Sequence, residues 1–331
     1  MIIVRTPLRV SFCGGGSDLP AFYEKHGGAV LSAGLGRYVY LSIHPYFHAD
    51  RLVCKYSKTE IVAKASKLKH PIFRVLLERF GINGAEITST ADVPAGTGLG
   101  SSSSFTVGLL HALYAYTGKY VSRGRLAEEA CRTEIDTLGE PIGKQDQYAA
   151  AFGGLHVFRF RKDGLTEAEP VLLSSEAAAR MERNLLMFYT GDLRSASAIL
   201  AEQGKNVREN AEKEKAQLAI LAMTDELHRE LTRDNIDALG PILHASWREK
   251  RKLASGIATP PIDEAYEKAL SAGATGGKLL GAGGGGFLLF YVPEHRHADV
   301  KNALSHLKHM EFGFSPGGSA VIHVGDKPKG H

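Results

Sequence analysis

The chain has 331 residues, of which 44% are hydrophobic and 23% charged, so its composition is that of a globular protein and argues against a disordered or fibrous class. The length favours two domains, at roughly 150 residues for each. A formal charge of +4 suits small anionic ligands, but no long basic run accompanies it, so we expect no nucleic-acid partner.

The three cysteines, Cys13, Cys54 and Cys131, stand far apart in the sequence. Their spacing indicates neither a disulfide framework nor a thiolate metal site, and it fits a reducing compartment. No window offers about 18 consecutive apolar residues, and the first residues do not have the pattern of a cleavable signal. We therefore expect a cytoplasmic protein without a membrane partner, and the sequence indicates no particular oligomeric state.

The first half of the chain predicts strands and helices separated by glycine turns. Alternating apolar residues mark the strands, apolar residues at helical spacing mark the helices, and Ser122 is a plausible helix cap. The predicted elements are a strand over 2–12 that ends at Gly14, Gly15 and Gly16, a strand over 86–93, a loop over 94–104, a helix from 105 to Gly118, a helix from Ser122 to Gly139, a helix over 146–152 and a strand over 155–158.

The second half opens with a polar stretch, 161–184, which we expect to link two lobes. The elements predicted after it are a strand over 185–189, helices over 194–235 and 241–255, a glycine-rich turn, a strand over 287–292, a helix over 296–309 and a last strand over 320–324. This alternation predicts an α+β or α/β class, and no internal repeat is visible.

The clearest chemical signal is the glycine and serine loop between the strand at 86–93 and the helix that follows. Glycines allow a backbone to approach a phosphate closely, and the free N–H groups of a helix start attract a polyanion. A Walker loop requires a lysine directly after its last glycine, and this loop has none there. The glycine spacing also differs from that of the dinucleotide fingerprint. A flexible turn with a serine cap is the alternative. The residues that we expect to bind phosphate are Pro94, Gly96, Gly98, Leu99, Gly100, Ser101, Ser102, Ser103 and Ser104.

A second glycine run covers 281–286 and matches the dinucleotide fingerprint as a text pattern. The residues after it predict a strand, whereas that fingerprint must open a helix. Taken alone, the run is as typical of a tight hairpin as of a ligand wall. Together with the first loop it indicates one wall of a site, to which we assign Gly283 and Gly284.

Two carboxylates stand out. Glu134 falls on the apolar face of its predicted helix, where a bare charge costs several kcal/mol unless a cation or a donor meets it. Mg²⁺ bridging phosphates is one such partner, and an ion pair with Arg or Lys at the edge of the face is the alternative. Asp146 stands at a helix start, where an aspartate most often caps the helix.

Four basic residues, Arg5, Arg9, Lys144 and Arg194, each lie beside a glycine turn or a strand end. Such positions suit contacts with an anionic ligand, and a solvated surface position is the alternative for each.

Three separated motifs resemble the superfamily of galactokinase, homoserine kinase, mevalonate kinase and phosphomevalonate kinase, known as GHMP kinases. They span 5–18, 94–104 and 278–290, in the order that the superfamily has them. The resemblance implies an α+β fold of two domains: an ATP-binding domain over 1–165, like the second domain of ribosomal protein S5, and a ferredoxin-like domain over 180–331. It places the active site between them.

Within the superfamily, the stretches 5–20, 139–148 and 189–197 are similar to the kinases of D-glycero-D-manno-heptose 7-phosphate. The resemblance implies transfer of phosphate from ATP to the anomeric hydroxyl of this sugar phosphate, which gives the 1,7-bisphosphate. Two alternatives stay open: a kinase of the same superfamily that acts on galactose, fucose or mevalonate, and a catalytically silent sensor.

Carried across by motif, the resemblance implies that Asp146 is the catalytic aspartate. From its charge and its nearness in sequence, we expect Lys144 to keep Asp146 ionised. Ser102 and Glu134 would bind Mg²⁺, with the choice among the four serines open by one position. Cys13 and Ser17 depart from the glycine and threonine of the heptose kinases. The residues expected to bind the substrate are Arg5, Gly15, Gly16, Ser17, Asp18, Arg194, Gly283 and Gly284, with Arg194 meeting the phosphate that the sugar already carries.

Overall fold

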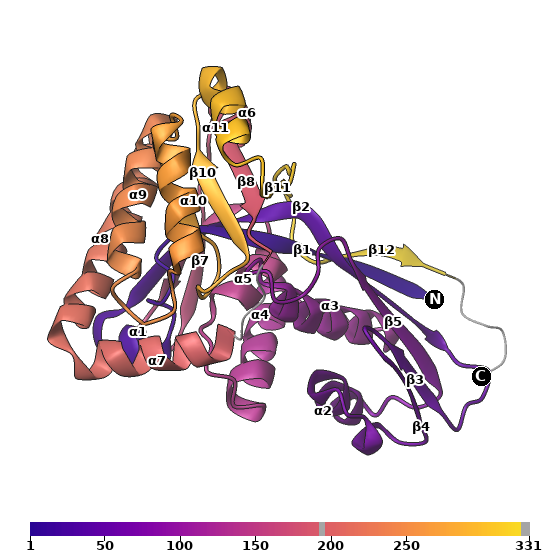
Figure 1. Cartoon of the computed structure of the whole chain (residues 1–331). Helices are drawn as coiled ribbons and strands as arrows, with labels where there is room; N and C mark the ends of the chain where they lie inside the picture. The colour runs from indigo at the N-terminus through magenta and orange to yellow at the C-terminus, as the bar shows by residue number, and fades with distance from the viewer. Residues whose placement is uncertain (192–195, 326–331) are drawn as a thin grey trace.

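The computed structural model describes residues 1–191 and 196–325, and within them the strands form two sheets (Figure 1). The larger sheet contains β1 (Ile2–Cys13), β2 (Gly28–Pro45), β3 (Leu52–Lys55), β4 (Thr59–Val62), β5 (Ala85–Ala91), β6 (Leu155–Phe160), β7 (Thr166–Pro170) and β12 (Ala320–Val324). The smaller sheet contains β8 (Leu185–Tyr189), β9 (Gly276–Leu279), β10 (Phe287–Tyr291) and β11 (Lys308–His309).

The long hairpin of β1 and β2 is the spine of the larger sheet, whose order is β12-β1-β2-β5-β3-β4. Strand β2 changes partner along its length: residues 28–33 pair with β6, and residues 39–45 pair with β5. The pairs are antiparallel except for β3 with β5. Because one strand carries two sets of partners, the sheet extends in both directions from the same hairpin.

The smaller sheet has the order β11-β8-β10-β9 and is antiparallel. Its central strand β10 is buried along its whole length, and the Phe290 ring packs against Tyr266 and Phe188. A strand covered on both faces loses the alternation of apolar and polar residues, which explains the continuous apolar run at 287–291.

Eleven α-helices are present among the described residues, and Figure 1 shows two groups of them. Helices α3, α4 and α5 lie together beside the β1-β2 hairpin, whereas α8, α9 and α10 stand on the side of the smaller sheet. The helices are α1 (Pro20–His26), α2 (Pro71–Phe80), α3 (Ser101–Tyr116), α4 (Arg123–Cys131), α5 (Gln145–Phe152), α6 (Ser175–Arg183), α7 (Ala196–Glu209), α8 (Ala211–Thr232), α9 (Leu239–Lys250), α10 (Pro260–Ser271) and α11 (His297–Ala303).

Most predicted elements are present, but the elements from α1 to α2 and strand β9 had no prediction, and further regions differ from the prediction. The stretch 161–184 is not a plain linker, since it holds β7 and α6. Strand β7 pairs only with β6, and most of its side chains are exposed, so it lacks an apolar pattern. Helix α10 was not predicted, although the Pro260-Pro261 pair at its start is a common opening signal. The helix predicted over 296–309 ends at Ala303.

The last described strand returns to the start of the chain. Strand β12 pairs with β1, with Val321 opposite Val4 and Ala320 opposite Arg5. A segment from the predicted second domain therefore completes the larger sheet, and the boundaries at 165 and 180 stay a prediction. Within the described part of the chain, no helix combines the length and the apolar character needed to cross a membrane.

Candidate active site

A cavity of about 440 Å³ opens between the two groups of helices and receives residues from distant parts of the sequence. The turn after β1, the loop before α3, the segment before α5, the start of α7 and the second glycine run all line it. The two glycine-rich segments thus lie at one site, although 181 positions separate Gly100 from Gly281.

The first glycine loop leads directly into α3, which begins at Ser101 and not, as predicted, at 105. Gly96, Gly98 and Gly100 have φ angles of 80°, 83° and 74°, in the region that favours glycine. These glycines line the cavity together with the three serines 101–103. Because the serines form the first helical turn, their backbone N–H groups lie at the positive end of the helix.

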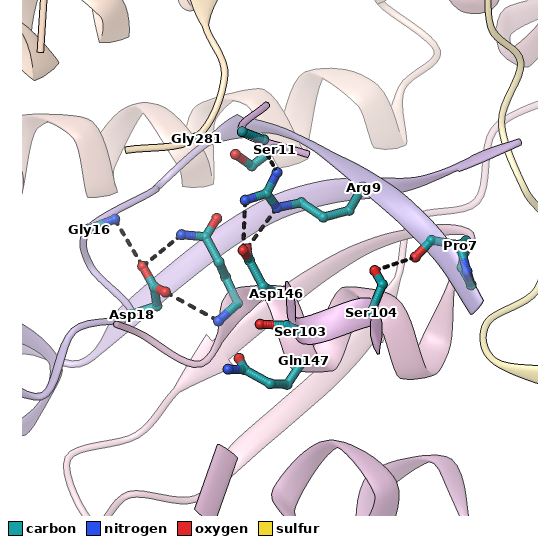
Figure 2. A network of polar contacts seen from close by, with 12 residues as sticks. Pro7, Arg9, Ser11, Gly16, Asp18, Ser103, Ser104, Asp146, Gln147 and Gly281 are labelled. Atoms are coloured by element: carbon teal, nitrogen blue, oxygen red, sulfur yellow. Dashed lines mark hydrogen bonds and ion pairs between the residues drawn. The ribbon is translucent and has the colours of Figure 1, made fainter. Parts of the chain in front are cut away.

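Three residues of the predicted phosphate loop do not line the cavity. Leu99 is buried in the core, and its carbonyl accepts a hydrogen bond from the Arg9 amide at 3.0 Å. Ser104 is fully buried and donates to the Pro7 carbonyl at 2.8 Å (Figure 2). Pro94 lies before the part of the loop that reaches the cavity. Leu99 and Ser104 hold the loop and the helix in place.

The second glycine run packs directly on the first. A Cβ atom at Gly98 would lie 2.7 Å from the Leu280 carbonyl oxygen, and one at Gly281 would lie 2.6 Å from the Gly98 Cα atom. Neither position has room for a side chain. Gly283 lines the cavity, whereas the Gly284 amide donates to the Ile257 carbonyl at 2.9 Å, outside it.

Asp146 is held in the cavity by Arg9. The Arg9 Nε and Nη2 atoms donate to the two Asp146 carboxylate oxygens at 2.7 and 2.9 Å (Figure 2). The Arg9 Nη1 atom donates to the Gly98 carbonyl at 2.6 Å. The Arg9 side chain is 4% exposed and that of Asp146 is 25% exposed. A two-point ion pair fixes the plane of the carboxylate, so Asp146 presents a defined edge to the cavity.

Lys144 does not have the position that the sequence predicted for it. Its ammonium group donates to the Gly164 carbonyl at 2.7 Å and lies 5.4 Å from the centre of the Tyr23 ring. It is adjacent to Asp146 in sequence, but its side chain leaves the helix start in another direction. The cation that contacts Asp146 is Arg9, which the sequence had indicated only as an anion contact.

Glu134 lies in a π-helical turn (Arg132–Thr137) that continues α4, and it is 2% exposed. It accepts hydrogen bonds from Ser103 at 2.8 Å, Thr106 at 2.9 Å and Gln147 at 2.5 Å, with the Ser102 hydroxyl at 3.4 Å. Burial raises the pKa of Glu134, and the hydrogen bonds oppose that rise. Neutral donors therefore surround a buried carboxylate that borders the cavity.

The residues around Glu134 fit a magnesium ion. Among the described residues Glu134 has no Lys, Arg or His nitrogen within 4.0 Å, so no ion pair of the chain itself neutralises it. A carboxylate and a hydroxyl are hard oxygen ligands, and Mg²⁺ commonly takes only one or two protein ligands besides phosphate oxygens and water. The Ser102 hydroxyl lies 3.4 Å from a Glu134 carboxylate oxygen, whereas Ser103 and Ser104 make shorter hydrogen bonds, so Ser102 is the serine near Glu134 that is more loosely held.

Asp18 also lines the cavity and is 1% exposed. It accepts hydrogen bonds from the Gly16 amide at 2.9 Å, the Gln145 amide at 3.2 Å and the Gln145 side chain at 3.1 Å (Figure 2). Burial, and next the charge of Asp146, raises the pKa of Asp18. Gly143 must be small, because a Cβ atom there would lie 2.0 Å from an Asp18 carboxylate oxygen.

The remaining predicted substrate residues divide into two groups. Gly15 and Gly16 line the cavity. Ser17 is buried away from it, with its hydroxyl bonded to the Ala29 backbone at 2.9 and 3.0 Å. Arg5 is exposed, and its guanidinium lies 4.9 Å from the centre of the Tyr38 ring. It does not line the cavity, because it precedes Arg9 by four residues, or about 13 Å of strand.

Arg194 falls outside the residues that the structure describes. The sequence did not indicate Lys250 or Gln145, both of which line the cavity. Lys250 carried the same signal as Glu134, since it is a charged residue on the buried face of a helix, three positions after Trp247 and seven after Leu243.

Comparison with protein families decides the family of this chain. The model described as "GHMP kinases N terminal domain" matches residues 63–154, and "GHMP kinases C terminal" matches residues 227–309, so that together they cover just over half of the chain. The chain belongs to the GHMP kinases. It is therefore an ATP-dependent kinase, as the motifs predicted, and the expected α+β fold of two domains is confirmed.

Two curated relatives span nearly this whole GHMP kinase. It is 28% identical to a D-glycero-alpha-D-manno-heptose 7-phosphate kinase of Campylobacter jejuni, over 92% of the chain and 93% of the relative. It is 25% identical to a galactokinase of Pyrococcus furiosus, over 92% of each.

Solved structures show the same fold. A D-glycero-D-manno-heptose 1-phosphate kinase of Bacteroides thetaiotaomicron has a TM-score of 0.81 at 24% identity, over 98% of this chain and 100% of the other. A mevalonate kinase of Methanococcus jannaschii has a TM-score of 0.72 at 17% identity, over 95% of this chain and 98% of the other. Similarities this low in identity establish the fold of this GHMP kinase and not its substrate.

The contact between the two glycine runs predicts a specific loss of nucleotide binding. Gly98→Ala adds a methyl group that must displace Leu280 or the glycine run, and a shift of about 1 Å in a ligand loop can cost roughly 100-fold. We expect the Kd for ATP, measured by calorimetry, to rise at least about tenfold.

Gly118→Ala is the matched control, because Gly118 has a similar φ of 70° but no atom within 4 Å of its would-be Cβ. It shares the backbone strain without the contact, and we expect ATP to bind it as it binds the wild type. Equal effects of the two substitutions would show that strain, and not the contact between the runs, governs binding.

Proposed function

We propose that this GHMP kinase transfers the terminal phosphate of ATP to the anomeric hydroxyl of D-glycero-D-manno-heptose 7-phosphate and so forms the 1,7-bisphosphate. The observation that carries the proposal is its similarity, over nearly the full length of both chains, to a heptose 7-phosphate kinase. The cavity supports it, since one carboxylate is fixed by Arg9 beside a phosphate-type glycine loop and a second lies among neutral donors.

Asp146 is the proposed base. Its carboxylate accepts the proton of the acceptor hydroxyl, whose oxygen forms the new bond to phosphorus while the bond to the leaving ADP breaks. Arg9 sets the plane of the carboxylate and also holds the Gly98 carbonyl, so the base and the nucleotide loop share one anchor. An in-line transfer requires a fixed position of the base relative to the nucleotide loop, and the shared contact with Arg9 fixes that position.

The nucleotide phosphates are proposed to lie on the loop from Gly96 to Gly100 and on the start of α3. Glycines there leave the backbone amides accessible, and the helix start favours negative charge. Glu134 and Ser102 would hold Mg²⁺, which when bound offsets the negative charge of the phosphates.

The acceptor is proposed to lie on the opposite side of Asp146, against Gly15, Gly16 and Asp18. The Asp18 carboxylate has the acceptor oxygens that sugar hydroxyls can donate to. Arg194 is proposed to meet the phosphate that the sugar carries. It precedes Ala196 by two positions, and Ala196 and Ser197 at the start of α7 line the cavity.

A coupled assay of ADP release tests the substrate directly. We expect kcat/KM for D-glycero-D-manno-heptose 7-phosphate to exceed that for the unphosphorylated heptose by about 100-fold. A substrate without the phosphate leaves the donors of the phosphate site without a partner. Equal use of the free sugar, or better use of galactose, fucose or mevalonate, would contradict the proposed acceptor. Binding of the sugar phosphate without ADP release would indicate a silent sensor.

The proposed magnesium site predicts a change in metal dependence. Glu134→Gln removes one carboxylate charge, so we expect the Mg²⁺ concentration for half-maximal rate to rise at least about tenfold. Burial raises the pKa of Glu134, so its ionised form costs stability, and that cost appears as the pH rises through its pKa. The Tm of Glu134→Gln at neutral pH is therefore expected not to fall.

Glu129→Gln is the control, because Glu129 is also a buried glutamate of the same helical region. Its carboxylate bonds to Tyr114, Arg79 and Arg125 and does not line the cavity. We expect this variant to lose stability without a change in its Mg²⁺ dependence. If the magnesium titration of Glu134→Gln matched the wild type, Glu134 would be a structural residue.

A further inference from the structure

Lys250 is a buried cation that the proposed transfer does not use. It is the last residue of α9, its side chain is 8% exposed, and it lines the cavity together with Arg9, Asp18 and Asp146. The apolar face of α9 carries it inward, because Leu243 and Trp247 of the same face are buried in the core. A lysine in such a position is costly unless its charge has a partner.

Its contacts within the chain leave the charge largely unmatched. The Lys250 Nζ atom donates to the Gly281 carbonyl at 2.5 Å. Within residues 1–191 and 196–325 no Asp or Glu oxygen lies within 4.0 Å of it. An ammonium group has three donors, and a single carbonyl satisfies one of them. Burial, and next the charge of Arg9, lowers the pKa of Lys250 to about 8.

The other buried lysine of this region shows what a purely structural role looks like. Lys278, on β9, donates to the backbone carbonyls of Ser11 at 2.8 Å and Phe12 at 3.1 Å and does not line the cavity. Burial, and next the charge of Lys250, lowers its pKa to about 7. Lys278 ties β9 to the end of β1, whereas Lys250 borders open space.

Asp18 and Asp146, the cavity carboxylates whose charges act on Lys250, are engaged elsewhere. Asp146 is paired with Arg9 through both oxygens, and Asp18 accepts three hydrogen bonds from Gly16 and Gln145. Arg9 also holds the Gly98 carbonyl, and Lys250 holds that of Gly281, at the place where the two glycine runs touch. Two cations thus border the cavity where a phosphate group would pass between the nucleotide loop and Asp146.

We propose that the ammonium group of Lys250 binds a phosphate oxygen in this cavity, either of the terminal phosphate of the nucleotide or of the phosphate that a sugar-phosphate acceptor already carries. The proposal rests on the proposed function for the second of these sources only. A phosphate oxygen supplies the negative charge and the acceptor lone pairs that the chain leaves out at this position.

The proposal predicts both an energetic and a pH-dependent signature. A charge-assisted hydrogen bond of this kind corresponds to about 10- to 150-fold in affinity. The charged groups that face Lys250 are Arg9 on β1, Asp18 after it, Asp146 on α5 and Lys278 on β9. Since an anion stabilises the protonated amine, phosphate binding should weaken as the pH rises above about 8, where free Lys250 loses its proton.

The test compares Lys250→Met with wild type by calorimetry, with Mg²⁺ present and each ligand added alone: ATP, ADP, heptose 7-phosphate and the free heptose. Lys252→Met is the matched control, because Lys252 lies two positions further on, is exposed and pairs with Glu249. We expect Lys250→Met to lose about 10- to 150-fold in affinity for one phosphate-bearing ligand while the partner that lacks that phosphate binds as before. Lys252→Met should leave all four affinities unchanged.

The pattern of loss identifies the source of the phosphate. Weaker binding of ATP with unchanged binding of ADP assigns Lys250 to the terminal phosphate of the nucleotide. Weaker binding of heptose 7-phosphate with unchanged binding of the heptose assigns it to the phosphate of the acceptor. Wild type should also lose roughly tenfold in that affinity between pH 7 and pH 9, and Lys250→Met should not. No loss for any ligand, or an equal loss for all four, would overturn the proposal.

The proposed acceptor fails in a distinguishable way. If wild type does not bind heptose 7-phosphate, the acceptor is another molecule, and the comparison of ATP with ADP alone decides the role of Lys250. Unfolding of the variant is monitored through its affinity for ADP and its Tm, since a misfolded protein would lose ADP as well.

Discussion

The two-point ion pair between Arg9 and Asp146 is the interaction on which the arrangement of the cavity depends. Arg9 comes from β1 and Asp146 from the start of α5, and the third guanidinium donor reaches the Gly98 carbonyl in the loop before α3. Three segments far apart in the sequence are therefore fixed to one planar group. Removing one partner of a buried pair typically costs about 3–5 kcal/mol, because the other charge is left unmatched.

Close backbone contacts surround this pair, and they explain why glycine occurs where it does. Gly98 and Gly281 bring the two glycine runs together, and Gly143 admits the Asp18 carboxylate at a distance that no side chain would allow. The glycines thus serve the packing of the site as much as its contact with a ligand. The charged groups of the cavity differ in their neighbours. Arg9 pairs with Asp146, Glu134 accepts hydrogen bonds from neutral donors, and Lys250 donates to a single carbonyl.

The sequence was most informative where a local pattern has a local cause. The strands at 2–12 and 185–189, the glycine loop, and the charge of Glu134 on an apolar face could all be recognised from spacing. Side-chain direction could not, and for this reason Lys144 was preferred to Arg9 as the neighbour of Asp146. Strand β7 was missed because an exposed edge strand has no apolar alternation. The start of α3 was predicted four residues late, because serines are as typical of caps and turns as of a first helical turn.

The turnover of Asp146→Asn tests the central claim, that the carboxylate held by Arg9 takes the proton of the acceptor. Asparagine has the shape of aspartate but is a poor base, and losing a general base commonly costs about 10² to 10⁴ in rate. The measurement is kcat, together with the Kd for ATP as a control on the nucleotide loop. The account predicts a kcat lowered by that factor with ATP still bound, and a kcat near that of wild type would contradict it.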